Sequence, residues 1–400
     1  MDNKLPKDWK IVKVGKYVIS TKGKKPKRIS NVKTNECNLP YVNIKAFEKG
    51  IIDEYTDGIG CVICEEGDFL MVWDGSRSGY VGKAIKGALG STLVRLNFPD
   101  LDNNYAYYFL QSKYIEINTR AKGVGIPHVD PNLLWNYELL IPPIETQQAI
   151  VSKIEELFSE LDKGIEDLKT AQQQLKTYRQ SVLKWAFEGK LTNENVKDGE
   201  LPKNWEMSTI GNIFEVHIGS TPKRNVSEYW GGNINWVSSG EIAFCNITKT
   251  KEQITKIGLE NTSCKVHPVG TVIIAMIGEG KTRGQAAILK IEASHNQNTA
   301  AIRVDNKTYL SELLYYYLFL KYQDNRKVGS GNNQKALNKE RVKKIEIPLP
   351  PLEEQHLIVQ EIESRLSVAD KMEESIAQSL QQAEALRQSI LKKAFSGELV

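Results

Sequence analysis

The amino-acid sequence predicts an α/β protein in which two mixed α/β domains are separated by a pair of long antiparallel coiled-coil helices, with pseudo-twofold symmetry. Three observations lead to this fold class. The chain repeats itself once, two long stretches carry a heptad pattern, and the regions between them contain short strand-like runs. A period of about half of 400 residues is far longer than that of a solenoid repeat, so it indicates two domains of one plan.

The repeat is visible in three blocks that recur in the same order. Leu-Pro-Lys-Asp-Trp at residues 5–9 returns as Leu-Pro-Lys-Asn-Trp at 201–205, and Pro-Pro-Ile-Glu-Thr-Gln at 142–147 returns as Pro-Pro-Leu-Glu-Glu-Gln at 350–355. The third block, Leu-Lys-x-Ala-Phe-x-Gly, ends at Gly189 and again at Gly397. These blocks divide the chain into a first domain at 1–141, a helix at 142–191, a second domain at 192–349 and a C-terminal helix at 350–400.

The repeat also predicts how the chain closes. The first helix leads shortly to the Leu-Pro start at 201–202, whereas the second helix ends beside the C-terminus. The only other Leu-Pro-x-x-Trp start is at residues 5–9, so we expect the N-terminal segment to lie beside the end of the second helix.

Each helix segment begins behind Pro-Pro and ends at a glycine, which can adopt the left-handed capping conformation. Apolar residues follow one another at steps of four and three, a coiled-coil signal, and the nearest partner for each apolar stripe is the other helix. The expected seam consists of Ile154, Phe158, Leu161, Ile165, Leu168, Leu175, Val182, Ile362, Leu366, Ile376, Leu380 and Ile390. Some forty residues span roughly 60 Å, nearly two turns of B-DNA, so the pair is expected to act as a ruler with a reading domain at each end.

Arg179 and Arg387 interrupt the two stripes at the same position of the repeat. In an antiparallel pair, a polar seam residue can fix the register of the helices. An arginine near the end of a seam can equally extend to solvent, and both interpretations stay open here.

The domains are expected to be rich in short strands, with one aromatic-rich helix each, at 104–112 and 311–322. Expected strands lie at 41–44, 60–64, 69–73 and 92–96 in the first domain, and at 235–238, 271–277, 286–291 and 300–304 in the second.

Composition limits the function classes. The sequence has no long apolar run and no apolar stretch after Met1, which predicts neither a membrane span nor an export signal. Five scattered cysteines suit reduced thiols in a cytoplasm. The net charge is only +4, but Lys and Arg are in excess in the domains and Asp and Glu in the helices. Nucleic acid is therefore a suitable partner for the domains, because clustered cations gain from counterion release.

The repeated blocks resemble those of the specificity subunits of type I restriction–modification systems. The family pattern Ile-Pro-Leu-Pro-Pro-Leu-x-Glu-Gln stands nearly intact at residues 347–355 and in reduced form at 140–147. The Leu-Pro-x-x-Trp start and the Ser-x-Leu-Lys-x-Ala-Phe-x-Gly-x-Leu helix end are each present twice. Tyr-Trp-Gly-Gly at 229–232 and Asn-Gln at 296–297 also look like family blocks, and the first domain lacks both.

The resemblance implies a DNA reader without catalytic activity of its own. The segments 1–141 and 192–349 would be target-recognition domains, each binding half of a split double-stranded DNA target. The paired helices would be spacers that dock two DNA methyltransferase subunits, and restriction–translocase subunits would complete the complex. No cofactor or metal is expected in this chain; S-adenosylmethionine, ATP and Mg²⁺ are expected in the partner subunits. A cytoplasmic location is expected.

Two motifs suggest other chemistry and are better explained structurally. Gly-Glu-Gly-Lys-Thr at 278–282 fits a relaxed phosphate-binding loop, but a strand-like run follows at 286–289 where such a loop needs a helix. Cys61 and Cys64 form a lone Cys-x-x-Cys with no second pair at usable spacing, which favours buried free thiols over zinc. The motifs of base methylation and of the common nuclease fold are absent from the sequence.

DNA reading requires phosphate contacts for register and base-edge contacts for specificity. Basic and polar residues on the glycine-containing loops are the candidates. They are Lys24, Lys25, Lys27, Arg28, Ser76, Arg77 and Ser78 in the first domain, and Lys223, Arg224, Lys281, Arg283, Asn332, Asn333, Gln334 and Lys335 in the second. Arg77 and Arg283 are preferred as base readers, since a guanidinium can bond guanine bidentately. Trp9, Trp205, Trp230 and Trp236 are expected to be core residues.

Two other function classes compete with this one. The chain could be a coiled-coil scaffold whose domains bind proteins, or a nuclease or methyltransferase that works alone. A steep, log-linear loss of DNA affinity with salt would separate the reader from the scaffold. Turnover by the purified chain would favour the enzyme.

Overall fold

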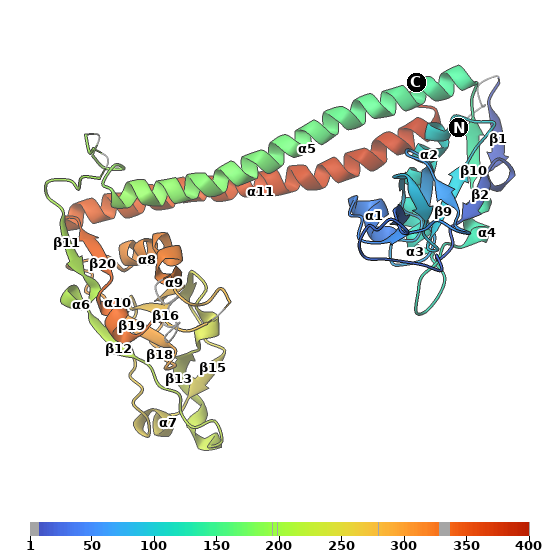
Figure 1. Cartoon of the computed structure of the whole chain (residues 1–400). Coiled ribbons are helices and arrows are strands. Elements are labelled where there is room, and N and C mark those ends of the chain that lie inside the picture. Colours follow the sequence, from blue (N-terminus) through green and yellow to red (C-terminus); the bar gives the residue numbers. More distant parts are fainter. Residues whose placement is uncertain (1–7, 194, 198, 279, 328–336, 400) are drawn as a thin grey trace. The chain divides into compact units, whose positions relative to one another are not determined.

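The computed structural model describes residues 8–193, 195–197, 199–278, 280–327 and 337–399. The chain divides into two units, residues 1–169 with 377–400 and residues 170–376. Each unit contains one mixed α/β domain and one end of each long helix (Figure 1). The predicted fold class is thereby confirmed.

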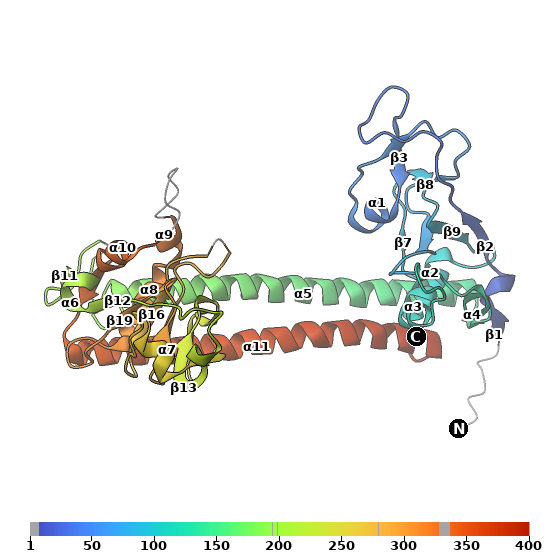
Figure 2. The ribbon, with the colours of Figure 1, turned by 90° about the horizontal axis from the view of Figure 1, so that it is seen from below.

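The long helices are α5, Ile144–Phe187, and α11, Leu352–Ser396, and they lie side by side in both units (Figure 2). In the first unit, Ile154 near the start of α5 shares a hydrophobic cluster with Ile390 and Ala394 near the end of α11. In the second unit, Leu183 near the end of α5 shares a cluster with Ile362 near the start of α11. The pair is therefore antiparallel.

The seam residues face inward along both helices. Six of the predicted seam residues are buried and six are half-buried, and none is exposed. The buried ones are Ile154, Phe158, Leu175, Val182, Ile362 and Ile390, and the half-buried ones are Leu161, Ile165, Leu168, Leu366, Ile376 and Leu380.

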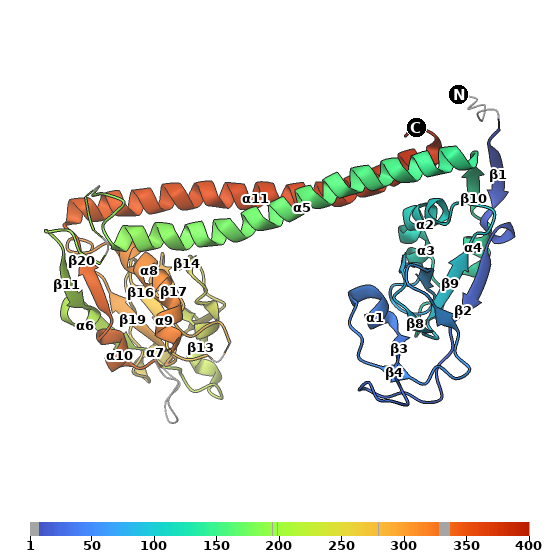
Figure 3. The same ribbon diagram turned by 45° about the horizontal axis from the view of Figure 1, so that its top comes forward.

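The first domain contains three sheets. They have the strand orders β2-β9-β6-β7, β4-β3-β8-β5 and β1-β10. The strands are β1 Lys10–Lys13, β2 Ile19–Lys22, β3 Leu39–Val42, β4 Tyr55–Thr56, β5 Ile63–Cys64, β6 Phe69–Val72, β7 Val81–Lys83, β8 Gly87–Leu89, β9 Leu93–Asn97 and β10 Glu138–Ile141. The helices are the 3-10 turn Val14–Lys16 and α1 Ile44–Lys49, α2 Asn103–Ser112, α3 Tyr114–Thr119 and α4 Pro131–Trp135. Strand β10, which belongs to the two-stranded sheet, leads into α5 (Figure 3).

The second domain follows the same plan, with strands distributed differently between its sheets. Their strand orders are β12-β19-β16-β17-β14, β15-β13-β18 and β11-β20. The strands are β11 Glu206–Thr209, β12 Glu215–Ile218, β13 Trp230–Val237, β14 Cys245–Ile247, β15 Glu252–Ile254, β16 Val272–Ala275, β17 Ala286–Leu289, β18 Ser294–His295, β19 Thr299–Arg303 and β20 Glu346–Leu349. The helices are α6 Ile210–Ile213, α7 Lys256–Glu260, α8 Ser311–Leu320, α9 Tyr322–Lys327, α10 Lys339–Lys343 and the 3-10 turns Ser227–Tyr229 and Ser239–Glu241.

Both aromatic-rich helices and the eight predicted strands are present, with shifted ends. The largest difference is at 235–238, where the strand begins at Trp230, and at 60–64 only Ile63–Cys64 forms a strand. Gly58 and Gly60 adopt positive φ angles of 74° and 71°, which bend the chain into a turn before that strand.

A buried glutamine explains the Pro-Pro-x-x-x-Gln block. Gln355 donates to the carbonyl of Pro350 at 2.9 Å and accepts from the backbone N–H of Leu310, just before α8, at 2.9 Å. Gln147 makes the same two contacts, with Pro142 at 2.9 Å and with Asp102, just before α2, at 3.0 Å. In each unit one side chain therefore joins the start of the long helix to the start of the aromatic helix.

The closure of the repeat is confirmed. Trp9 packs with Phe395 and Leu399 in the core of the first unit, and its ring lies beside Gly397. In the second unit, Trp205 packs beside Gly189 in the same way. Each unit thus has one tryptophan against the glycine that ends a long helix.

Candidate nucleic-acid interface

In the first domain, two of the predicted loops leave the same edge of one sheet. The strands β2 and β6 both pair antiparallel with β9, so β2 and β6 run in the same direction and end at the same edge. The basic run 22–28 follows β2, and the loop 74–79 follows β6. An edge where strands end in loops is a common place for binding residues, because the sheet holds the loops in position.

A third loop joins them. Lys22 pairs with Asp74 at 2.8 Å, which links the first two loops. The backbone N–H of Gly75 donates to the carbonyl of Pro127 at 2.8 Å, and Asp74 forms a β-bridge with His128. The loop between α3 and α4, which extends from the body of the first domain (Figure 1, teal), therefore belongs to the same surface.

The search for basic loops in the sequence does not identify this third loop, because its tip is apolar. Val124 is fully exposed and Ile126 is 69% exposed. The signal that could have identified it is the Gly-Val-Gly-Ile-Pro sequence at 123–127, in which glycines flank an apolar residue before a proline.

Most of the predicted first-domain residues are available to a ligand. Lys24, Lys25, Lys27, Arg28, Ser76 and Arg77 are exposed. Arg77 is held in place by Glu48 at 3.0 Å and lies over the ring of Tyr80 at 4.1 Å. It still exposes 46% of its side chain.

The structure corrects the expectation that the Ser78 side chain is accessible to DNA. Its side chain is fully buried, so it does not present a hydroxyl to DNA. The backbone turns at this point, with the N–H of Ser78 bonded to the carbonyl of Gly75 at 3.0 Å. Asn118 then donates to the carbonyl of Ser78 at 3.0 Å, which holds the residue against α3.

The second domain repeats this arrangement. The strands β12 and β16 both pair antiparallel with β19 and end at one edge, where the loops 219–226 and 276–285 begin. Thr221 hydrogen-bonds Gln297, and the N–H of Met276 donates to the carbonyl of Asn298 at 2.9 Å. The loop 296–298 therefore joins the other two.

The predicted residues of the second domain differ in their surroundings. Lys223, Arg224 and Lys281 are exposed. Arg283 is half-buried and donates to the carbonyl of Arg326 at 3.0 Å, so its guanidinium is directed at its own domain. Four further candidates, Asn332, Asn333, Gln334 and Lys335, lie outside the described residues.

Two tryptophans support the loop that carries Arg224. The indole N–H of Trp236 donates to the carbonyl of Ser220 at 3.1 Å, and that of Trp230 donates to the carbonyl of Lys223 at 3.2 Å. Trp236 and Trp205 are buried, as expected of core residues, while Trp9 and Trp230 are half-buried. The guanidinium of Arg224 lies 3.9 Å from the centre of the Trp230 ring and pairs with Glu252.

A buried polar chain lies behind this loop. Arg303 donates to His267 Nδ1 at 3.2 Å, His267 Nε2 contacts His295 Nε2 at 3.2 Å, and His295 Nδ1 contacts Thr299 at 2.7 Å. If both histidines are neutral, one assignment of protons satisfies every contact, with Thr299 donating to the carbonyl of Asn296 at 2.9 Å.

The neutral state of the two histidines follows from their environment. Burial lowers the pKa of His267 to about 3 and that of His295 to about 4, and the neighbouring positive charges act in the same direction on His267. The carbonyl of His295 accepts from the N–H of Ser220 at 2.9 Å, so these hydrogen-bonded side chains support the candidate loop directly.

The phosphate-binding-loop motif has the structural explanation expected of it, and the Cys-x-x-Cys motif has it in part, because Cys61 is half-buried. The residues 276–285 connect β16 to β17, which pair antiparallel, so a strand follows where a phosphate-binding loop needs a helix. Cys64 is buried, and burial raises the pKa of its thiol to about 11. Within the described ranges, no group of His, Cys, Asp and Glu is arranged to hold a metal ion.

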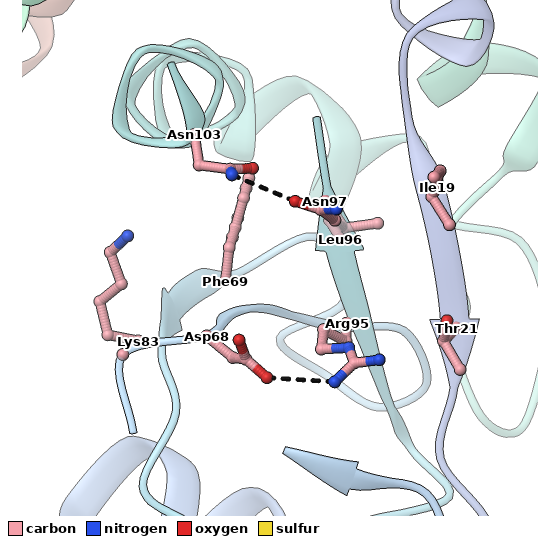
Figure 4. A pocket seen from close by; sticks show the side chains of 10 residues that line it. Ile19, Thr21, Asp68, Phe69, Lys83, Arg95, Leu96, Asn97 and Asn103 are labelled. Carbon is pink, nitrogen blue, oxygen red and sulfur yellow. Dashed lines mark hydrogen bonds and ion pairs between the residues drawn. The ribbon is translucent and has the colours of Figure 1, made fainter. Parts of the chain in front are cut away.

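The first domain also contains a cavity of about 380 Å³, on the side of the sheet where β2 and β6 begin, away from the candidate interface (Figure 4). Asp68 and Arg95 pair within it at 3.3 Å, and Asn103 donates to Asn97 at 3.1 Å. Lys83 lines it as well and is held by Asn104 at 2.7 Å. Asp68 and Arg95 therefore already stabilise one another, and Lys83 is held by α2.

The geometry defines a class of protein: a tandem pair of α/β domains, each presenting basic loops at one sheet edge and each followed in the sequence by one of two long antiparallel helices. The model of the type I restriction modification DNA specificity domain matches residues 6–170 and 202–384. The chain belongs to this family.

Curated relatives and solved structures agree with that assignment. The chain is 26% identical to the type I restriction enzyme MjaVIII specificity subunit of Methanocaldococcus jannaschii, over 99% of this chain and 94% of the relative. It is 24% identical to the EcoBI specificity subunit of Escherichia coli, over 92% and 82%. Among solved structures, a chain of a type I R-M system matches with a TM-score of 0.75 and 21% identity over 99% of both chains. The HsdS subunit of Thermoanaerobacter tengcongensis matches with a TM-score of 0.63 and 20% identity, again over 99% of both, and these two show the fold.

No helix in the described part of the chain combines the length and the apolar character needed to cross a lipid bilayer.

Proposed function

We propose that this chain is the DNA-reading subunit of a cytoplasmic type I restriction–modification complex. Each domain binds one half of a bipartite double-stranded DNA target, and the chain directs methyltransferase and restriction subunits to it. The chain itself carries out no chemistry. S-adenosylmethionine, ATP and Mg²⁺ are used by the partner subunits.

One observation carries this proposal. The two domains place loops at equivalent strand edges, after β2 and β6 in one and after β12 and β16 in the other. The second loops differ in sequence, Gly-Ser-Arg-Ser-Gly at 75–79 against Gly-Glu-Gly-Lys-Thr-Arg-Gly at 278–284. A shared scaffold with different loops is what two unlike half-sites require, because base edges are read by side chains at defined positions.

The docking of two methyltransferase subunits is supported by a second pattern. Exposed residues on one face of α5 are Glu155, Ser159, Lys163 and Glu166, and the equivalent exposed residues of α11 are Glu363, Ser367, Lys371 and Glu374. Packing does not explain this identity, since the eight side chains are exposed. Two identical surfaces suit two copies of one partner.

The first of these surfaces borders a groove. A cavity of about 640 Å³ lies between α2 and the helix pair, and Tyr108, Phe158 and Arg387 line it together with Glu155, Ser159, Lys163 and Glu166. A cleft with an aromatic floor and a charged rim is suited to receiving a helix or a loop of another protein.

The DNA-reading role is tested by methylome mapping and by salt titration. Host genomic DNA with and without this gene should differ by one bipartite methylated motif. The purified chain should bind DNA containing that motif, with log affinity falling linearly with log salt, and should neither methylate nor cut it. Salt-independent or undetectable DNA binding would favour a protein-binding scaffold instead.

The spacer role of the helices is tested by removing one heptad from each. Deleting residues 167–173 and 376–382 keeps the heptad phase, leaves both interhelical arginine–aspartate pairs in place and spares the exposed residues of both docking surfaces. The helices become shorter by about 10 Å, so the methylated motif should lose about three base pairs of spacer and keep both half-sites. An unchanged spacer would contradict the ruler.

The docking surfaces are tested by charge reversal. Lys163→Glu and Lys371→Glu should each remove one of two bound methyltransferase subunits, measured by native mass spectrometry, and the double variant should bind none. Lys176→Glu is the matched control, because Lys176 is exposed on α5 and its counterpart in the repeat is Glu384.

A further inference from the structure

The two domains share a short motif although most of their loops differ in sequence. Residues 23–28 read Gly-Lys-Lys-Pro-Lys-Arg, and residues 219–224 read Gly-Ser-Thr-Pro-Lys-Arg. The first follows β2 and the second follows β12, so both lie at the sheet edge of the candidate interface. The shared pattern is Gly-x-x-Pro-Lys-Arg.

The backbone holds both copies in the same way. The N–H of Gly23 donates to the carbonyl of Leu93 at 3.0 Å, and that of Lys24 donates to Leu89 at 3.2 Å. In the second domain, Gly219 donates to Thr299 at 3.5 Å and Ser220 donates to His295 at 2.9 Å. The acceptors occupy equivalent positions at and before β9 and β19.

Packing explains the glycine and the proline. A Cβ on Gly23 would lie 2.1 Å from the carbonyl oxygen of Gly90, and a Cβ on Gly219 would lie 2.1 Å from that of His295. The two prolines, Pro26 and Pro222, are buried.

Packing does not explain the lysine and the arginine, which are exposed in both domains. The arginines have carboxylate partners: Arg28 lies 3.4 Å from Glu36, and Arg224 pairs with Glu252. Within the part of the chain that the structure describes, Lys27 and Lys223 have no ion-pair partner. At the lysine position that the two motifs share, each domain therefore presents an ammonium group without an ion-pair partner among the described residues.

We propose that Lys27 and Lys223 bind backbone phosphates and set the position of each domain on DNA, while the loops 75–79 and 278–284 read the bases. This inference rests on the proposed function. Two domains that read different half-sites share only the sugar–phosphate backbone as a ligand, so residues identical in both contact the backbone. The arginines, held by Glu36 and Glu252, brace the turn that presents each lysine.

The test uses the full chain with Lys27→Gln, Lys223→Gln and the double variant. Lys86→Gln and Lys256→Gln are matched controls, because these lysines are exposed in the same two domains and lie outside the motif. Affinity is measured over a range of salt on the target DNA and on a duplex with both half-sites scrambled. The methylated motif is mapped in cells that express each variant.

Each lysine variant should lose affinity for both duplexes by the same factor, roughly eightfold at 0.1 M salt, as expected for one lost phosphate contact. The slope of log affinity against log salt should fall by about one per lysine, and the methylated motif should be unchanged. Lys27→Arg and Lys223→Arg should retain the slope, which excludes misfolding as the cause.

Two results would overturn the inference while leaving the proposed function intact. If a lysine variant loses base specificity at one position of a half-site while the slope of log affinity against log salt is unchanged, the lysine reads a base. Unchanged affinity and slope, with a wild-type chain that binds DNA, would make it a solvated side chain. If the wild-type chain shows no salt-dependent DNA binding, the proposed function itself fails.

Discussion

Arg179 of α5 lies 2.6 Å from Asp370 of α11, and the same pair recurs one repeat later, because Arg387 of α11 contacts Asp162 of α5. The two arginines also occupy equivalent positions of the repeat, as do the two aspartates. Arg179 additionally contacts Glu373 at 2.9 Å, and Arg387 lies 4.5 Å from the centre of the Phe158 ring. The arginines therefore pair across the two helices, which favours the register-fixing interpretation over extension to solvent.

Breaking one of these pairs should cost little stability. Arg179→Ala should lower the free energy of unfolding by about 0.5 kcal/mol, because Asp370 is largely exposed and solvent screens the pair. The exchange Arg179→Asp with Asp370→Arg should recover part of the loss in a denaturant titration. If the exchange is as unstable as the sum of the single changes, the pair does not fix the register.

The buried glutamines should matter more than the ion pairs. Gln355→Ala leaves the carbonyl of Pro350 and the N–H of Leu310 without their partner in a buried environment, at a cost of about 2–4 kcal/mol. Gln147→Ala should have a similar effect in the first unit. Gln360→Ala, at an exposed position of the same helix, is the control and should change the unfolding midpoint very little. Equal effects of Gln355→Ala and Gln360→Ala would contradict this role.

The second domain should lose stability in acid. His267 and His295 have folded-state pKa values of about 3 and about 4, below the ordinary histidine value, so protonation favours the unfolded chain. The stability they contribute is present above pH 6.5 and is lost as the pH falls toward 4. Thermal unfolding followed between pH 7 and pH 4 should show this decline.

A neutral replacement gives the control for that pH dependence. His267→Gln removes one titrating group, so the decline of the melting temperature below pH 6.5 should become shallower. A variant whose decline is as steep as that of the wild type would show that other groups cause it.

Neighbouring residues of one loop should behave differently on DNA. Arg77→Lys keeps the charge but loses the guanidinium fork. It should therefore reduce the discrimination against wrong bases at one position of one half-site by about 1–3 kcal/mol, measured by competition with single-base variants of the target. Ser78→Ala should leave DNA affinity and specificity unchanged, because the Ser78 side chain is buried. A specificity change in Ser78→Ala would show that the loop rearranges on binding.

Much of the fold follows from local patterns. The heptad stripes of α5 and α11 depend on residues three and four apart, so the sequence predicts both helices and their pairing. The whole domain that connects the two helices favours the antiparallel direction. The closure by Trp9 and Gly397 follows from the order of the repeated blocks. The helix ends follow from Pro-Pro and glycine, whose effects are confined to their own turn.

The candidate interface is less predictable because long-range contacts determine it. Lys27, Lys223 and Arg77, which are exposed, can be predicted from the sequence because basic residues on glycine-containing loops are a local signal. A single backbone turn buries Ser78, and the carbonyl of Arg326 orients Arg283. Neither contact is visible in the neighbouring residues of the sequence.

The sequence by itself determined that this protein is a duplicated α/β chain with two paired helices, because repeats and periodicity are properties of the chain order. Only the tertiary structure decided which side chains share a surface. It placed the apolar loop at 123–127 beside Gly75 and the buried pair His267 and His295 behind the loop of Arg224. Sheet pairing brings these segments together from distant parts of the chain, and the free energy of that packing does not depend on any local pattern.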